Sequence, residues 1–153
     1  MRFFSASSSN EGRYNQRLES RTEPNESSIR ASKAYMRRIK SARSFDEILG
    51  IHEEMDKLGI KRTVYTYTTA VSTCRRRGEW KQALALWEDM HKEGIVPNVV
   101  TYNAIISACE RSLQLEKAID LFNEMQKTGI NPDVITYNAV ISACEKGSQS
   151  EKA

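Results

Sequence analysis

The sequence predicts an all-α fold in which helix–turn–helix hairpins of 35 residues stack into a right-handed solenoid. Threonine recurs at positions 66, 101 and 136, and tyrosine follows it each time. A cysteine recurs with the same step at positions 74, 109 and 144. A constant period of this length is typical of stacked repeats. Within each period, apolar residues also recur every three or four residues, which predicts amphipathic helices.

Residues 1–28 are rich in Ser, Asn, Glu and Arg and show no apolar period, so we expect them to be disordered. The opening MRFFSASSSN is typical of an organelle transit peptide, because it combines arginine, phenylalanine and serine without an acid before Glu11. Further glutamates at positions 19, 23 and 26 are not typical of one. An ordinary loose terminus or a misplaced gene start is therefore an equal alternative.

Residues 29–63 have the pattern of a degenerate copy of the repeat. We expect this copy to stack as a helical cap. Its second half has apolar residues and one histidine at helical spacing, namely Phe45, Ile48, Leu49, His52 and Met55. Its first half lacks the Thr-Tyr pair and has Lys33 where the other copies have Thr or Asn.

Residues 64–98 and 99–133 predict two complete hairpins, identical at 13 of 35 positions. In the first, Tyr67, Ala70, Val71 and Cys74 give a helix of about twelve residues. Gly78 can end that helix in a left-handed conformation, and a second helix follows from residue 80. Residues 134–153 match the start of the preceding unit and stop in the first turn of an expected second helix. This end indicates a fragment or a truncated gene model.

Composition excludes several classes of protein. No apolar run approaches the roughly 20 residues that span a bilayer, so we expect no membrane segment. Three cysteines, one in each of three units, argue against a disulfide framework or a zinc site and predict small core residues in a reducing compartment. Residues 1–63 have 13 basic against 9 acidic residues, and residues 64–153 have 10 against 11. Any nucleic-acid binding by the repeats therefore needs a locally arranged face.

A polar stripe lies beside the apolar one on each first helix. Along each stripe, an amide or hydroxyl side chain, a serine and a cation follow one another at intervals of four residues. Stacking of the units would bring the corresponding side chains of successive helices into parallel rows. The rows are Thr68, Ser72 and Arg76; Asn103, Ser107 and Arg111; and Asn138, Ser142 and Lys146. Donor–acceptor groups beside cations can contact a base edge and hold a phosphate. Any solvated helix face also contains such residues, so chance agreement is the alternative.

The pattern V-x-T-Y-N-A-x-I-S-A-C, followed by A-x-x-L-F-x-E-M-x-x-x-G-I-x-P-D, resembles the pentatricopeptide repeat family of the P type. The resemblance covers residues 29–153 and is strong from Val64 onward. Tetratricopeptide repeats have a similar architecture, but their W-x-x-L-G-x-x-Y pattern is absent.

The resemblance implies that each unit binds one base of single-stranded RNA through its fifth and last residues. Thr68 with Asn98 implies adenine, and Asn103 with Asp133 implies uracil with some tolerance of cytosine. Asn138 lacks its partner, and Lys33 with Thr63 matches no usual pair. The resemblance also assigns Tyr65, Val100 and Ile135 as residues that wedge against bases. It assigns Arg76, Arg111 and Lys146 as phosphate contacts.

We expect no enzyme and no cofactor. No Ser-His or Cys-His spacing or glycine-rich phosphate loop is present, and His52 and His91 occupy different repeat positions. The resemblance implies RNA processing, stability or translation in a mitochondrion or chloroplast, with the cytoplasm as the alternative location. A helical scaffold for protein partners is the alternative function. So few units predict weak RNA binding, which a longer parent protein or self-association would tighten.

Overall fold

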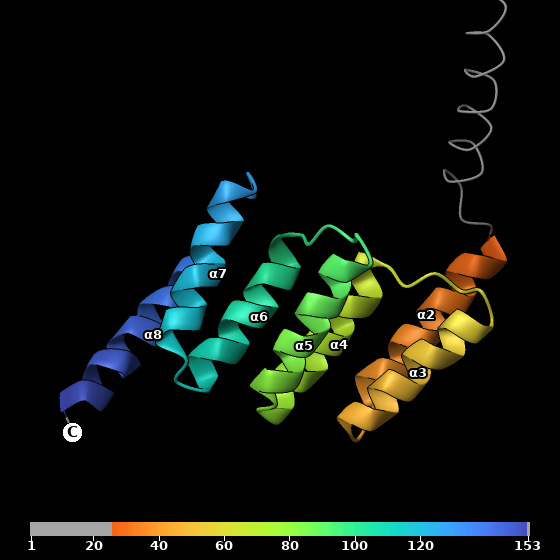
Figure 1. Cartoon of the computed structure of the whole chain (residues 1–153), viewed down its shortest axis with the longest axis horizontal. Helices are drawn as coiled ribbons and strands as arrows, with labels where there is room; N and C mark the ends of the chain where they lie inside the picture. Colours follow the sequence, from red (N-terminus) through yellow and green to blue (C-terminus); the bar gives the residue numbers. More distant parts are fainter. Residues whose placement is uncertain (1–25, 153) are drawn as a thin grey trace, which may run out of the picture.

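The computed structural model describes residues 26–152, which form seven helices and no strand. The helices are α2 (Glu26–Ser41), α3 (Phe45–Lys57), α4 (Val64–Arg77), α5 (Trp80–Lys92), α6 (Val99–Arg111), α7 (Leu115–Lys127) and α8 (Val134–Lys152). They follow one another along the long axis of the molecule (Figure 1). The all-α repeat architecture predicted from the sequence is confirmed.

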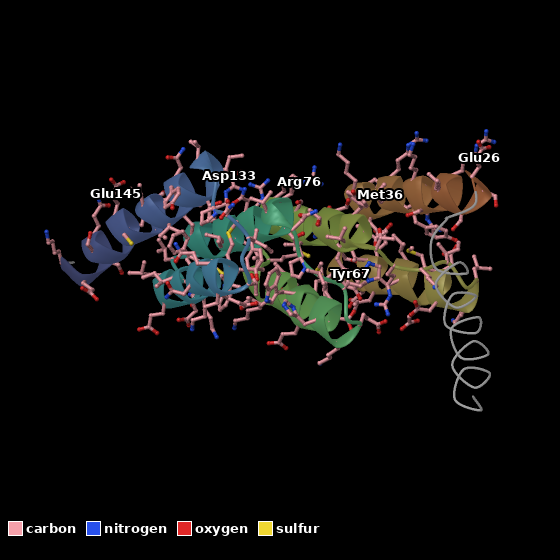
Figure 2. All side chains as sticks on the ribbon, turned by 90° about the horizontal axis from the view of Figure 1, so that it is seen from above. Glu26, Met36, Tyr67, Arg76, Asp133 and Glu145 are labelled. Atoms are coloured by element: carbon pink, nitrogen blue, oxygen red, sulfur yellow. The ribbon has the colours of Figure 1, made fainter. Side chains whose placement is uncertain are left out.

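The helices form two layers. Helices α2, α4, α6 and α8 lie in one layer, and each contacts the next. Helices α3, α5 and α7 lie in the other layer (Figure 2), where each packs against the first helix of its own hairpin. Corresponding positions of α4, α6 and α8 therefore come side by side, as stacked hairpins require.

Local signals place the helix ends. The side chain of Thr63 accepts a hydrogen bond from the backbone N–H of Thr66 at the start of α4, and Asn98 does the same for Thr101 in α6. Each threonine hydroxyl in turn accepts from the backbone N–H of the cap, which completes a capping box. At the other end of α4, Gly78 has φ +75°, the left-handed conformation predicted for it.

The core lies between the two layers. Tyr67, Ala70, Val71 and Cys74 are all fully buried, which confirms the predicted apolar face of α4. Figure 2 shows Tyr67 between the layers. One contact recurs at every junction: a ring of a second helix meets the edge or face of the tyrosine of the next first helix, with centroids 4.7 to 5.6 Å apart. These pairs are His52–Tyr67, Trp87–Tyr102 and Phe122–Tyr137.

Several predictions at the two ends differ from the structure. Helix α2 begins at Glu26, so residues 26–28 are helical where the sequence predicted disorder. The predicted disorder of residues 1–25 lies outside the described residues. Leu49 was predicted on the apolar face of α3 but is 39 % exposed, whereas Ile48, Ile51 and Met55 are buried against the neighbouring helices.

The C-terminal end departs further. The chain was predicted to turn after the first helix of the last unit, but α8 continues without a break to Lys152. Gly147 lies inside this helix, and Leu115 packs so closely that an added Cβ would lie 2.6 Å from its Cδ2 atom. Cys144 was predicted in the core and is exposed, whereas Cys74 and Cys109 are buried. No second helix covers α8 within the described chain.

Burial raises the pKa of the Cys74 and Cys109 thiols to about 11, which makes both poor nucleophiles at neutral pH. Among residues 26–152, no helix has the length and apolar character that crossing a membrane requires.

Candidate RNA interface

Three large apolar side chains are exposed at the start of successive first helices. They are Tyr65 at 64 %, Val100 at 57 % and Ile135 at 59 % exposed. Each is the second residue of its unit. An exposed apolar side chain therefore recurs along the first-helix layer, once in each of these units. These are the residues predicted to wedge against bases.

The last residue of each unit is the N-cap of the next first helix. Asn98 Oδ1 accepts from the backbone N–H of Thr101 at 3.0 Å, and Asp133 Oδ1 accepts from that of Thr136 at 3.0 Å. An N-cap residue has extended backbone and a side chain fixed against the helix end. Capping therefore places both predicted base-recognition residues at the junction of two hairpins.

Between α6 and α8, the predicted recognition pair is in direct contact. Asn103 Nδ2 donates to Asp133 Oδ1 at 3.0 Å, and Thr136 Oγ1 donates to Asn103 Oδ1 at 2.5 Å. The backbone N–H of Thr136 and the amide of Asn103 donate to the Asp133 carboxylate, and these bonds lower its pKa. An ionised carboxylate accepts hydrogen bonds and donates none.

Between α4 and α6, the two residues predicted to form a recognition pair are joined indirectly. Thr68 and Asn98 share no hydrogen bond, but the hydroxyl of Thr101 lies between them. Its Oγ1 atom is 2.7 Å from Thr68 Oγ1 and 2.9 Å from Asn98 Oδ1. The structure thus brings Thr68, Asn98, Asn103 and Asp133 to two equivalent junctions.

The remaining recognition positions are different. Asn138 is exposed on α8, where no further unit of the described chain lies beside it. At the junction of α2 and α4, Thr63 caps Thr66, and Lys33 is exposed. This junction has no amide or hydroxyl to match Thr68 or Asn103, so it lacks a recognition pair.

The predicted phosphate contacts lie late in the first helices and reach back to the preceding one. Arg76 donates to the backbone carbonyl of Lys40 at 3.2 Å, and Arg111 to that of Arg75 at 3.5 Å. Figure 2 shows Arg76 and Asp133 on the outer side of the first-helix layer. The two guanidinium groups have further donors and remain exposed, so they can also contact an anion.

Lys146 has a different partner. Its ammonium group forms an ion pair with the Glu110 carboxylate, to which Ser142 also donates at 2.7 Å. Burial raises the pKa of Glu110, but the hydrogen bonds from Lys146 and Ser142 outweigh it and the pKa lies below its usual value. A phosphate at Lys146 would therefore compete with Glu110.

Two family models match the chain. The PPR repeat family matches residues 97–146, and the pentatricopeptide repeat domain matches residues 50–112. The two matches overlap and together run from residue 50 to residue 146.

The chain belongs to the pentatricopeptide repeat (PPR) family.

Solved PPR structures have the same architecture. Maize PPR10 is 28 % identical with a TM-score of 0.67, over 89 % of this chain and 19 % of PPR10. A PPR10 variant in complex with an 18-nucleotide PSAJ RNA element is 27 % identical with a TM-score of 0.61, and the match covers 77 % of this chain and 18 % of the PPR10 chain. The PPR domain of Arabidopsis thaliana PRORP1 in complex with tRNA is 18 % identical with a TM-score of 0.61, and the match covers 78 % of this chain and 67 % of the PRORP1 chain.

The chain thus spans about a fifth of the length of PPR10. No curated protein matches it.

Three residues of this PPR chain that contact the predicted site residues were not predicted from the sequence, namely Thr101, Thr136 and Glu110. The two threonines were noted only as markers of the period, although a threonine three residues after Asn98 or Asp133 is typical of a helix cap. Glu110 pairs with a residue 36 positions away, which nothing in the local sequence indicates.

Proposed function

We propose that this chain binds single-stranded RNA along its first-helix layer, with one base at each junction between complete units. The observation that carries this proposal is the recurrence, at one side of the stack, of three different groups at each junction. These are an exposed apolar side chain, a polar pair and a cation. Bases stack on apolar side chains, polar pairs contact base edges, and cations hold phosphates. PPR10 and PRORP1, which share this fold, have been solved in complex with RNA.

The chemistry of each pair supports the base preference. The Asp133 carboxylate only accepts hydrogen bonds, which suits the N3–H donor of uracil. At the preceding junction, Asn98 uses its Oδ1 atom for the helix cap, so its Nδ2 donor is left for a base nitrogen such as adenine N1. The proposed preference is A followed by U, with cytosine tolerated at the second position.

The number of units limits the affinity. Stacking contributes on the order of 1–3 kcal/mol per base. Association costs roughly 4–15 kcal/mol. Two complete junctions therefore give weak binding, which additional units or self-association would strengthen.

Exchanging one pair tests the preference. In the double variant Asn103→Thr and Asp133→Asn, the second junction acquires the residues of the first, and the preferred second base should change from U to A. The measurement is binding of the chain to short RNAs that differ only at that base. Asn123→Thr on α7, in the other layer, is the control and should change nothing. An unchanged U preference in the double variant would disprove the assignment.

We also propose that the protein acts on organelle transcripts, in a mitochondrion or chloroplast. The Arg- and Ser-rich opening of the sequence supports this location. A fluorescent fusion of the full chain should enter the organelle, and a fusion without residues 1–25 should stay in the cytoplasm. Equal location of the two fusions would argue against the targeting role.

A protein-binding scaffold is the second candidate. An open groove of about 700 Å³ lies along the loops between hairpins, lined by apolar Ile95, Pro97, Val99 and Ile130 among others. Titration of a labelled A/U oligonucleotide at low and high salt separates the candidates. RNA binding should weaken as salt rises, with a log–log slope of about −2 if three phosphates are neutralised. A scaffold would bind no oligonucleotide at either salt concentration.

A further inference from the structure

The hydroxyls of Thr101 and Thr136 are central to the two recognition junctions. Both threonines are fully buried. Each belongs to the helix cap of its own unit and also contacts the fifth residue of the preceding unit, 33 positions earlier. Helix capping requires only the first of these contacts.

The contact with Asn103 fixes the orientation of its carboxamide. Asn103 Oδ1 faces the Thr136 hydroxyl at 2.5 Å, and Nδ2 faces the Asp133 carboxylate at 3.0 Å. Rotation of the carboxamide by half a turn would remove the hydrogen bond to its oxygen and place that oxygen against a carboxylate. The two ends of an asparagine side chain have nearly the same shape, so only such bonds distinguish them.

An unfixed asparagine would offer a base either a donor or an acceptor. The Asp133 carboxylate, which accepts from the N3–H donor of uracil, would then lose its fixed contact with Nδ2, and the pair would discriminate poorly between uracil and bases with an acceptor at that position. Asn138 has no such bond and is exposed, since within residues 26–152 no threonine of a following unit lies beside it. Its sequence context is nearly the same as that of Asn103, so the difference comes from the following unit.

We propose that Thr101 and Thr136 are positioning residues that fix the base-recognition pair of the preceding unit, so that each unit becomes selective only when the next unit stacks on it. This inference rests on the proposed function. The threonines act through the pair, and the donor and acceptor atoms of the pair contact the base.

The chain provides a matched control for testing Thr136. Thr66 occupies the same position in α4 and forms the same type of cap with Thr63. No recognition pair lies at its junction. Thr66→Val therefore removes a capping hydroxyl of the same kind without affecting base recognition, whereas Thr136→Val removes both functions. Thr136→Ser retains the hydroxyl.

The first measurement is binding of the full chain and its variants to four hexanucleotides that have a common A followed by U, C, A or G. In Thr136→Val, the preference for U over the purines should fall about tenfold, the size expected for one lost pair of base contacts. Thr136→Ser and Thr66→Val should retain the preference. The proposal is overturned if Thr136→Val retains it, or if Thr66→Val loses it equally.

The second measurement needs no RNA. In NMR spectra, the side-chain amide protons of Asn103 should exchange with solvent at least tenfold faster in Thr136→Val than in the parent chain. Thr66→Val should leave this rate unchanged. If the parent chain binds none of the four RNAs, the proposed function fails, and the exchange rate of Asn103 alone decides the positioning role. An unchanged exchange rate in Thr136→Val would overturn that role.

Discussion

Helices α6 and α8 have nearly the same sequence in different surroundings. Residues 99–118 and 134–153 are identical at 14 of 20 positions. Helix α6 ends at Arg111, and α7 packs against it, whereas α8 continues to Lys152 through the positions that form a turn after α6. Four of the six differences fall in the turn itself, where residues 111–115 read RSLQL and residues 146–150 read KGSQS, so nearly identical first helices lead into a turn in one place and into a continued helix in the other.

Burial shows the same contrast. Tyr102 is fully buried, while its equivalent Tyr137 is 48 % exposed. Tyr102 contacts the ring of Trp87 on one side, and its hydroxyl donates to Glu124 of α7 on the other. Tyr137 has the first type of contact, with Phe122, but residues 26–152 include no second helix of its own unit to cover it. The second helix of a unit thus buries the tyrosine of its own first helix, as α7 does for Tyr102.

The turn after α6 has a backbone cost that α8 avoids. Leu113 has φ +58°, a left-handed conformation that is unfavourable for a side chain with a Cβ. The equivalent residue, Ser148, stays helical. Packing of α7 against α6 offsets the cost at Leu113, whereas in the part of the chain that the structure describes α8 has no second helix of its own unit to pack in the same way.

The largest expected contrast between the two helices comes from their tyrosines. Tyr102→Ala should lower the free energy of unfolding by about 3–5 kcal/mol, because it leaves a cavity in the core. Tyr137→Ala should lower it by about 1 kcal/mol, since nearly half of that side chain is already in water. Urea denaturation measures both values. Equal losses would show that the two ends of the stack do not differ in packing as described.

A second prediction uses the equivalent contact at the N-terminal junction, where the ring is His52. Its two nitrogens have no hydrogen-bond partner, and burial and the charge of Arg62 lower its pKa from 6.5 to about 4, against the opposite effects of Asp89 and Asp56. The unfolded chain therefore binds more protons between these values. The free energy of unfolding therefore keeps its full value above pH 6.5 and falls by about 3 kcal/mol as the pH drops towards 4.

The control for this prediction is His52→Phe, which introduces the residue that α7 has at the same repeat position. The stability of this variant should fall much less between pH 6.5 and 4.5, where the wild type loses most of the stability due to His52; the remaining fall comes from carboxylates such as Glu54, whose pKa the folded chain lowers. Urea denaturation across this range measures both. If the variant shows the same pH dependence as the wild type, the loss does not come from His52.

The smallest expected effect concerns the turn itself. Leu113→Gly should raise the free energy of unfolding by about 1 kcal/mol, because glycine adopts positive φ without strain and the Leu113 side chain is mostly exposed. The matched change Ser148→Gly should instead lower the stability of α8 by about 0.5 kcal/mol, as glycine does inside a helix. Thermal unfolding followed by circular dichroism measures both. Effects of the same sign would contradict the difference between turn and helix.

The sequence predicts much of the candidate site, because its recurring parts are local. Asn98 and Asp133 precede a threonine by three residues, which places them at helix starts. Tyr65, Val100 and Ile135 fall off the apolar stripe and are therefore exposed. The bond from Thr136 to Asn103 and the pairing of Lys146 with Glu110 could not be predicted, because both depend on the distance between neighbouring helices.

The sequence by itself determined the period, the helical hairpins and the face on which the proposed recognition residues lie. Caps, left-handed glycines and apolar spacing act over a few residues, so they operate wherever the sequence occurs. Only the tertiary structure decided that Asn103 is buried and Asn138 exposed, and that Cys144 lies outside the core. These outcomes depend on apolar surface buried by a neighbouring helix, and a stretch of sequence does not contain its neighbour.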